Sequence, residues 1–378
     1  MKRVALGWLV ACSMLAACAG STVPKPPSLA ELRREAEARP QDARAWRELA
    51  LAELFLAGGE AKRAERAAVH AYKLDAKSPE VAFAQGLLAD VHGHPSAALD
   101  AYLTTITLAA HANTPSAQQL IEAASYAVLG QSGMTRGYPE RVSARLLPLV
   151  ELPSLSLAAR SAIVEVLLPV AQRRGDLALQ AKLAASLGCP REFRIAGPFG
   201  PRDLLGFDAA PPVDLSQPLG ASYDLGPTRG VREVRNAKLH ACTVHLGGGP
   251  VAEAGQTLAE TTLNVPAQGD YAVRLDTPNN AELFVDGKSV LRVDRRKVLG
   301  ARVLFAKLAL TAGAHRMVVR VNSRHPNPVL ELGVTPYQAA DAGAMQLPAA
   351  RPDMPGLPLY LRVSLALARG DVLLARQA

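Results

Sequence analysis

Histidines and glycine-rich segments are the parts of this sequence whose side chains or backbone are suited to chemistry. His92 and His94 flank a glycine, but a metal ion would need two further ligands that the sequence does not supply. His240 and His245 are five residues apart, which puts them on opposite faces of a strand. The sequence has no Gly-x-Ser-x-Gly, P-loop or His-Glu-x-x-His motif, and the glycine run at 247–249 lacks a following Lys-Ser/Thr. We therefore predict no metal site, no cofactor and no catalytic activity.

The N-terminal 18 residues have the layout of a secretion signal. Two basic residues precede an apolar stretch over 4–15 that is too short for a stable membrane span. Residues 15–18, Leu-Ala-Ala-Cys, resemble the bacterial lipobox, in which the cysteine is lipidated and the chain is cut before it. The resemblance implies a signal peptide at 1–17, a lipid on Cys18 that holds the protein to a membrane and, because Ala19 is not Asp, the outer membrane. An ordinary signal peptide with an incidental Cys18 is the alternative.

The segment after the lipobox and the charge of the chain bear on its surroundings. Residues 18–28 are small, polar and proline-rich, which is typical of a tether. The formal net charge of +8 falls to +6 without 1–17, because that segment carries two basic residues and no acid. A basic protein outside the cytoplasm can favour anionic lipid headgroups or cell-wall acids. Nucleic acid is not an expected partner in that compartment.

Cys189 and Cys242 are the two cysteines that follow the leader and Cys18. The expected compartment is oxidising, so they are a candidate disulfide that would tie the start of the second half to a later strand. The loop would hold about 50 residues, and its closure would stabilise the fold by about 4 kcal/mol if unstrained. Two separate buried thiols are the alternative.

A run of positive charge marks a candidate basic patch in the second half. Asp294 is the one acid in this stretch. The patch could meet phosphates of a lipid, cell-wall acids or an acidic protein, or it could be a solvated strand face that protects an edge strand. Its members are Lys288, Arg292, Arg295, Arg296, Lys297, Arg302 and Lys307.

The composition calls for more than one domain. The 378 residues are 49% apolar and 20% charged, which suits two or three packed cores and excludes global disorder. No apolar run of about 18 residues follows the N-terminus, so several membrane spans are excluded. Near residue 189 the composition changes from helix-like to strand-like.

The first half has the apolar spacing of helices, with glycine breaks between them and proline in several first turns. Ser28 and Glu31 form a capping box, in which each side chain satisfies a free amide at the start of a helix. We expect helices at 29–38, 42–57, 60–74, 79–91, 95–110, 115–130, 139–150, 156–173 and 176–187.

Small and large side chains recur at matching places in two of these helix pairs. The first set is Trp46, Leu49, Ala50, Ala67, Ala71, Tyr72, Leu74, Asp75 and Pro79, and the degenerate second set is Phe83, Gly86, Ala89, Ala98, Ala101 and Tyr102. The pattern resembles the tetratricopeptide repeat, although Trp46 and Phe83 are 37 residues apart where the family has about 34. The resemblance implies a helical solenoid over 29–188 with a concave surface that binds a protein partner. A helical scaffold that only holds the next domain is the alternative.

The second half has short alternating runs that are typical of half-buried strands, such as 271–276 and 316–321. Asp286-Gly287 predicts a two-residue hairpin turn, because both positions need a positive φ. So many short strands favour an antiparallel β-sandwich over 189–337. We expect strands at 233–246, 257–264, 270–276, 281–286, 289–293, 301–310, 315–322 and 328–334, with an irregular excursion over the sheet at 200–230.

One stretch of these strands has a recognisable pattern. Residues 269–294, GDYAVRLDTPNNAELFVDGKSVLRVD, are followed at 310–321 by LTAGAHRMVVRV. This pattern is similar to the PA14 and galactose-binding-like group of sandwiches, and the resemblance covers about 257–335. Some members bind carbohydrate through calcium held by adjacent aspartates. Here Asn279-Asn280 stand in that loop without an Asp-Asp pair, so carbohydrate is an alternative ligand and calcium is not expected.

The C-terminal residues have the pattern of a new helical pair. After a linker at 338–358, residues 359–378 give an apolar helix, a turn at Gly370-Asp371 and the opening of a partner helix that stops after two turns. This segment is expected to start a second helical repeat region. Half a repeat leaves its apolar face uncovered, so we expect either a truncated product of a longer gene or a partner that covers this end.

These observations predict a multidomain α+β protein with a TPR-like solenoid, an antiparallel β-sandwich and a short C-terminal helical segment. Its predicted function is a non-catalytic, protein-binding scaffold anchored in the bacterial outer membrane. Two alternatives remain open. One is the N-terminal, non-catalytic part of a larger envelope enzyme, such as a transglutaminase-like one, and the other is a carbohydrate-binding envelope protein.

Overall fold

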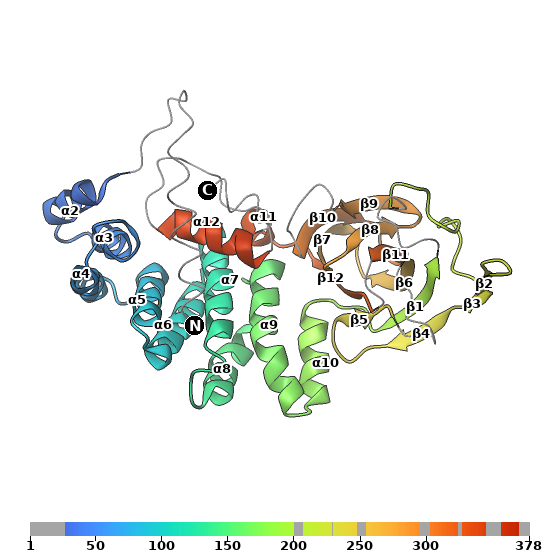
Figure 1. Cartoon of the computed structure of the whole chain (residues 1–378), viewed down its shortest axis with the longest axis horizontal. Helices are drawn as coiled ribbons and strands as arrows, with labels where there is room; N and C mark the ends of the chain where they lie inside the picture. The colour runs from blue at the N-terminus through green and yellow to red at the C-terminus, as the bar shows by residue number, and fades with distance from the viewer. Residues whose placement is uncertain are drawn as a thin grey trace, which may run out of the picture.

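The computed structural model describes residues 27–112, 114–199, 207–228, 230–247, 255–294, 303–323, 327–344 and 357–369. The chain is α+β: a helical region is followed by antiparallel sheets and then by a short helix (Figure 1). The helical region consists of α2 (Leu29–Ala38), α3 (Ala43–Phe55), α4 (Ala61–Leu74), α5 (Pro79–Val91), α6 (Pro95–Ala109), α7 (Pro115–Gly130), α8 (Tyr138–Leu146), the 3₁₀ turn η1 (Leu147–Leu149), α9 (Leu157–Arg173) and α10 (Leu177–Ser186).

Polar side chains cap the start of six of these helices, whereas α4, α6 and α8 begin without a side-chain cap. Ser28 accepts the Glu31 amide while Glu31 accepts the Ser28 amide, which confirms the capping box. The other capping side chains accept amides of the first turn in the same way, so the predicted helix bounds agree with the observed ones to within about two residues. The exception is the helix expected at 139–150, whose last turn is η1. These caps are Asp42, Ser78, Thr114, Ser156 and Asp176.

The helices pack as successive hairpins: α3 on α4, α5 on α6, and α9 on α10. The first helices of these hairpins, α3, α5 and α9, form one row together with α7, in which each helix contacts the next. Gly86 of α5 allows one of the close approaches, because a Cβ atom there would lie 2.5 Å from the ring of Tyr102 on α6. We call the surface formed by α3, α5 and α7 the inner face.

The sheet region has two antiparallel sheets that enclose one apolar core, with side chains such as Val319 and Leu283 from one sheet and Val273 and Leu332 from the other. The six-stranded sheet has the order β4-β1-β6-β11-β8-β9, the four-stranded sheet has the order β10-β7-β12-β5, and β2 pairs with β3. The strands are β1 (Glu192–Phe199), β2 (Ser222–Asp224), β3 (Val231–Glu233), β4 (Arg235–Lys238), β5 (Thr243–His245), β6 (Gly255–Val265), β7 (Gly269–Asp276), β8 (Asn280–Val285), β9 (Lys288–Val293), β10 (Val303–Leu310), β11 (Gly313–Ser323) and β12 (Val329–Pro336).

One strand prediction needs correction. The single strand expected at 233–246 is wrong: β4 pairs with β1, whereas β5 pairs with β12 of the other sheet, so the chain changes sheets between them. Strand β1 runs through Gly197-Pro198 to Phe199 with a shift in register against β6. Gly197 makes this shift possible, because its φ is +119° and a Cβ atom would lie 2.7 Å from the Gln256 carbonyl oxygen.

The irregular segment 207–220 covers the outer face of the six-stranded sheet, as expected for the excursion within its described part. Leu215 and Leu219 pack on Leu258, Phe284 and Val318, which point away from the central core. Both faces of this sheet are therefore buried in its middle, and its outer face carries buried charged side chains such as Glu260 and Arg320 beside the apolar ones.

The C-terminal helix does not stand apart from the first half. Two helices follow the sheets, α11 (Asp341–Ala344) and α12 (Leu357–Ala368). Leu357, Leu361 and Leu365 of α12 join the apolar core of the helical region, and α12 packs on α7 (Figure 1). The apolar face that was expected to lack a cover is therefore covered by the chain's own inner face. The partner helix expected from 372 onward lies outside the described residues.

The predicted hairpin turn is confirmed: Asp286 has φ 49° and Gly287 has φ 79°. The Asp286 carboxylate accepts the Arg316 amide at 2.9 Å and faces His315 Nδ1 at 2.7 Å. The other ring nitrogen of His315 lies 2.8 Å from the Thr311 carbonyl oxygen. Because both ring nitrogens face acceptors, the protonated imidazole fits best, and the bond to Asp286 raises the pKa of His315.

The close approach of Gly86 to Tyr102 predicts that no side chain larger than that of glycine fits at position 86 without loss of stability. Gly86→Ala should lower the free energy of unfolding by about 1–3 kcal/mol, because the ring of Tyr102 must move, with at most about 1 kcal/mol regained from helix propensity. Gly130→Ala is the matched control, since nothing lies within 4 Å of the Cβ position in the last turn of α7. Urea denaturation measures both variants. Equal effects of the two substitutions would contradict the packing argument.

The His315–Asp286 pair predicts a pH-dependent contribution to stability. The raised pKa of His315 stabilises the fold below its unfolded value of about 6.5, and this stabilisation is lost as the pH rises through the folded pKa. Burial opposes ionisation of Asp286, but its hydrogen bonds to His315 and Arg316 lower its pKa, so this contribution is lost as the pH falls below about 4. The free-energy difference between the wild type and His315→Gln should therefore be largest between these limits. A difference that grows above pH 8 would refute this assignment.

Candidate functional site

The inner face holds α12 through aromatic and aliphatic contacts. The ring of Tyr360 stacks on Phe55 at the end of α3, with centroids 5.7 Å apart, and meets Phe83 of α5 edge-on at 5.8 Å. Leu361 and Leu365 lie one turn apart on the same side and are buried. The helix thus uses one apolar face against three helices of the helical region, which is how an amphipathic helix binds a groove.

Two carboxylates contact the two ends of α12. Glu48 of α3 accepts the Leu357 amide at 3.1 Å, so it caps the first turn and faces the positive end of the helix dipole. Glu122 of α7 accepts Arg369 Nε at 2.8 Å and Nη2 at 2.6 Å, a bidentate ion pair. Burial opposes the charge of Arg369, yet Glu122 raises the pKa of Arg369. Each end of α12 therefore has its own acidic contact.

Charge complements shape at this site. Segment 357–369 carries Arg362 and Arg369 and no acidic residue, and both arginines are at most 7% exposed. Their spacing of seven residues, two helical turns, places them on one face. Glu48 also pairs with the neighbouring Arg47. Glu122 is 2% exposed, and a buried carboxylate needs a cation beside it, so α12 supplies a charge that the inner face requires.

None of these residues was predicted as a site from the sequence, although a signal for them is present there. Glu122 interrupts the apolar residues at 120–124, LIEAA, on a helix where the neighbouring side chains are buried. Arg362 and Arg369 stand two turns apart in an otherwise apolar helix. Lone charges of opposite sign in two distant apolar helices indicate a buried pair. Which acid meets which base is decided by the fold.

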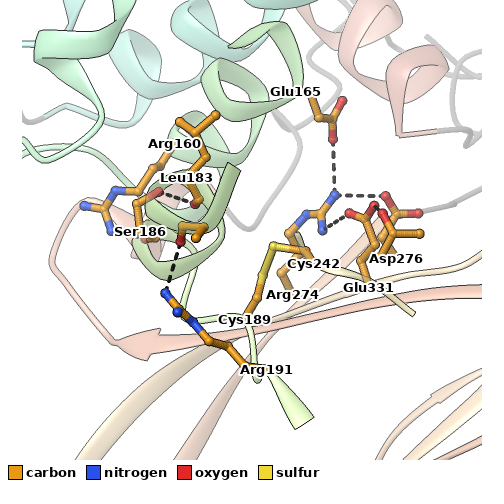
Figure 2. Close-up of a disulfide and its surroundings, with 12 residues drawn as sticks. Arg160, Glu165, Leu183, Ser186, Cys189, Arg191, Cys242, Arg274, Asp276 and Glu331 are labelled. Atoms are coloured by element: carbon orange, nitrogen blue, oxygen red, sulfur yellow. Dashed lines mark hydrogen bonds and ion pairs between the residues drawn. A yellow bond between two sulfur atoms is a disulfide. The ribbon is translucent and has the colours of Figure 1, made fainter. Parts of the chain in front are cut away.

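A second buried centre joins the helical region to the sheets (Figure 2). Arg274 of β7 donates to Asp276 at 2.9 Å, to Glu331 of β12 at 2.9 Å and to Glu165 of α9 at 3.2 Å. The Arg274 side chain is 1% exposed. Burial opposes its charge, but the carboxylates outweigh burial and raise the pKa of Arg274. This contact ties α9 to both strands.

One tyrosine lies within reach of both arginine centres. Burial raises the pKa of Tyr126 on α7, and the charges of Glu165 and Glu122 raise it further, while Arg274 and Arg369 oppose them. Arg369 also lies 5.3 Å from the centre of the Phe305 ring on β10. The C-terminal end of α12 therefore meets the helical region and the sheet region at one place.

The predicted cysteine pair lies at the same boundary. Cys189 and Cys242 form a disulfide with their Cα atoms 5.3 Å apart, beside Arg274 in Figure 2. Gly188 and Gly333 allow the chain to pass close to β12, since Cβ atoms on them would lie 1.8 Å from the Val334 oxygen and 2.6 Å from the Leu187 oxygen. The bridge thus fixes the chain where it leaves α10 and where it crosses between sheets.

The candidate basic patch does not form one free surface among the described residues. Lys288 and Arg292 lie on β9 of one sheet, and Lys307 lies on β10 of the other. Arg292 pairs with Asp208 and Glu282, and Lys307 pairs with Asp270 at 2.7 Å. Both strands are sheet edges, which suits edge protection. Arg295, Arg296, Lys297 and Arg302, like Cys18, lie outside the described residues.

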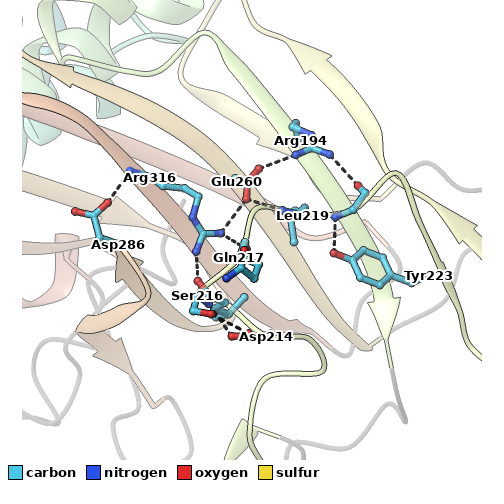
Figure 3. Close-up of polar contacts among 11 residues, drawn as sticks. Arg194, Asp214, Ser216, Gln217, Leu219, Tyr223, Glu260, Asp286 and Arg316 are labelled. Atoms are coloured by element: carbon cyan, nitrogen blue, oxygen red, sulfur yellow. Dashed lines mark hydrogen bonds and ion pairs between the residues drawn. The ribbon is translucent and has the colours of Figure 1, made fainter.

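Arginines of the six-stranded sheet hold the segment that covers its outer face (Figure 3). Glu260 of β6 accepts Arg194 at 3.0 Å, Arg316 at 3.1 Å and the Leu219 amide at 2.9 Å. Arg316 also donates to the carbonyl oxygens of Leu215 and Gln217. These bonds satisfy backbone groups of a segment that has no sheet partner, so this polar layer has a structural role.

Two kinds of site are absent from the part of the chain that the structure describes. No three His, Cys, Asp or Glu side chains gather there in a way that would hold a metal ion. Within the same residues, no helix is long and apolar enough to cross a bilayer.

Comparisons with known proteins give no family. No family model and no curated protein matches the chain. Among solved structures, it is similar to a β-glucosidase from Kluyveromyces marxianus in complex with glucose, with 15% identity and a TM-score of 0.25 over 29% of this chain and 15% of that one. The selenomethionine-labelled form gives 12% identity and a TM-score of 0.27 over 40% and 17%. The chain spans less than a fifth of those enzymes, and such TM-scores carry no argument about its fold or activity.

The Arg274 centre predicts a large and pH-dependent loss of stability. Arg274→Met should lower the free energy of unfolding at pH 7 by about 3–5 kcal/mol, because buried carboxylates lose their cation. Without it their folded pKa values rise, the folded state binds more protons than the unfolded state, and the loss should shrink as the pH falls. Glu165→Gln is the control: its side chain is 32% exposed, so the loss should stay below about 1 kcal/mol. An equal loss at pH 7 and pH 4.5 would contradict this account.

Proposed function

We propose that this protein is a lipid-anchored, non-catalytic scaffold of the bacterial envelope that binds a protein partner on its inner face. The observation that carries the proposal is the seating of α12: α3, α5 and α7 receive a helix through aromatic contacts and through Glu48 and Glu122. A surface that binds one amphipathic helix by these means is chemically suited to bind others.

We also propose a family resemblance for each of the two folded regions. We infer a TPR-like solenoid, supported by the stacked helix pairs and by the close approach of Gly86 to Tyr102. We also infer a sandwich of the PA14 and galactose-binding-like group, supported by two sheets around one core and by the Asp286 turn bonded to His315. Both units present surfaces and neither needs a cofactor for this function.

The proposed location in the bacterial envelope is inferred from the N-terminal signal sequence and lipobox alone. Lys2, Arg3 and the apolar stretch that follows suit export, and Cys18 at the end of the lipobox suits lipidation. Several acyl chains on that cysteine would hold the protein stably at a membrane. The proline-rich residues 19–28 would then separate the inner face from the bilayer surface.

Photo-crosslinking in living cells tests the scaffold function. A crosslinking residue replaces Phe55, which is 48% exposed beside α12, or Leu177, which is 54% exposed on α10 and serves as the control. Position 55 should give a discrete adduct with one envelope protein that position 177 does not give. Cys18→Ser should remove the lipid, release the protein from the membrane fraction and abolish this adduct. Identical adducts from both positions would contradict binding at the inner face.

A further inference from the structure

We propose that α12 is a resident ligand of the inner face and that the partner's own helix displaces it. The partner helix is apolar, carries no acid, and has an arginine or lysine twelve residues after its first helical amide. This inference rests on the function proposed above and specifies what the inner face recognises.

The positions of Glu48 and Glu122 determine how far apart the first helical amide and the cation of a bound helix must be. Glu48 binds the amide of Leu357, and Glu122 binds the guanidinium of Arg369. Twelve helical steps separate these residues, which is about 18 Å along the axis. A helix that presents its first turn to Glu48 must therefore place its cation three to four turns later to reach Glu122. A shorter or longer spacing satisfies only one of the two carboxylates.

The chemistry of the two ends is directional. Glu48 faces free amides, which occur at the N-terminus of a helix and carry partial positive charge. Glu122 is 2% exposed and accepts two hydrogen bonds from one guanidinium, an arrangement that favours arginine over lysine. A helix bound in the opposite direction would place its carbonyl groups against Glu48. The inner face therefore selects orientation as well as charge.

The middle of the site selects an aromatic side chain. Tyr360 is the fourth residue of α12, and its ring lies between Phe55 and Phe83. Leu361 and Leu365 fill the remaining apolar contacts. Glu48 and Glu122 contact the bound helix, so an acidic residue on that helix would be repelled by these two carboxylates. Segment 357–369 accordingly carries two arginines and no acid.

The geometry favours exchange of α12 over a permanent place in the core. The helical region has its own hairpin contacts, α3 with α4 and α5 with α6, that do not involve α12. The edge of the site is open: Phe55 is 48% exposed and Leu367 of α12 is 44% exposed. The ends of α12 are held by Glu48 and Glu122, contacts that another helix can replace without repacking the hairpins.

Peptide binding to the unlipidated chain from residue 19 onward tests the displacement. The probe is a fluorescent peptide with the sequence of residues 355–370, measured by anisotropy. Arg369→Glu places two carboxylates together and should release α12, so the peptide should bind this variant at least tenfold more tightly than the wild type. Glu122→Arg combined with Arg369→Glu restores a pair of opposite sign and should close the site again.

Two controls make this result specific. Lys238→Glu breaks an exposed ion pair with Glu192, between β4 and β1 of the six-stranded sheet, and should bind the peptide as the wild type does. A peptide with glutamate in place of Arg369 should bind the Arg369→Glu protein at least tenfold more weakly than the probe. Equal binding of both peptides, or equal binding by all variants, would overturn the proposal.

Hydrogen exchange of the wild type provides an independent test that needs no folded variant. The amides of 357–369 should exchange at least a hundredfold faster than those of α5 and α7, and faster again with excess peptide. Equal protection of these three helices would show that α12 is a permanent core element and would refute displacement. A wild-type dimer that exchanges α12 between copies would also overturn the inference of a foreign helix.

The two proposals can fail separately. If position 55 still crosslinks to an envelope protein while the peptide never displaces α12, the scaffold function stands and this inference falls. If the peptide exchanges as expected but no adduct forms in cells, the site recognises the stated helix and the scaffold function falls.

Discussion

Buried charged side chains that need an opposite charge from another part of the chain are the constraint on which this structure depends. Glu122 is nearly inaccessible and receives Arg369 from α12, 247 residues later in the sequence. Arg274 of β7 is equally buried and is compensated by Asp276 of its own strand, Glu331 of β12 and Glu165 of α9. An uncompensated charge in such a place is strongly destabilising. Each pair therefore requires two distant segments to be folded and docked at the same time.

The consequence is a single boundary at which three parts of the chain meet. Helices α7 and α9 present the acids, β7 and α12 present the arginines, and Phe305 of β10 lies against Arg369. The disulfide Cys189–Cys242 fixes the chain on the sheet side of this boundary. Any event that moves α12 must therefore change the electrostatics around Glu122 and Tyr126, next to the contact with the sheets.

Polar layers elsewhere in the molecule have a more local role. On the outer face of the six-stranded sheet, Arg316 and Glu260 bind backbone groups of the segment that covers them. At the hairpin, Asp286 binds both the Arg316 amide and the ring of His315. These side chains bind irregular segments to the sheet, because such segments form no strand-to-strand hydrogen bonds with it. They explain why charged residues occur on strands whose opposite side faces the apolar core.

The sequence by itself determined what depends on neighbouring residues. Caps such as Ser28 fixed the helix bounds, and Asp286-Gly287 fixed a turn, because these signals act within a few residues. The change of sheet between β4 and β5 was decided only by tertiary structure, since alternation has the same period in either sheet. The place of α12 was decided in the same way. Its apolar face and its arginines were visible in the sequence, but which surface and which acids they meet depends on a fold that brings residue 369 to residue 122.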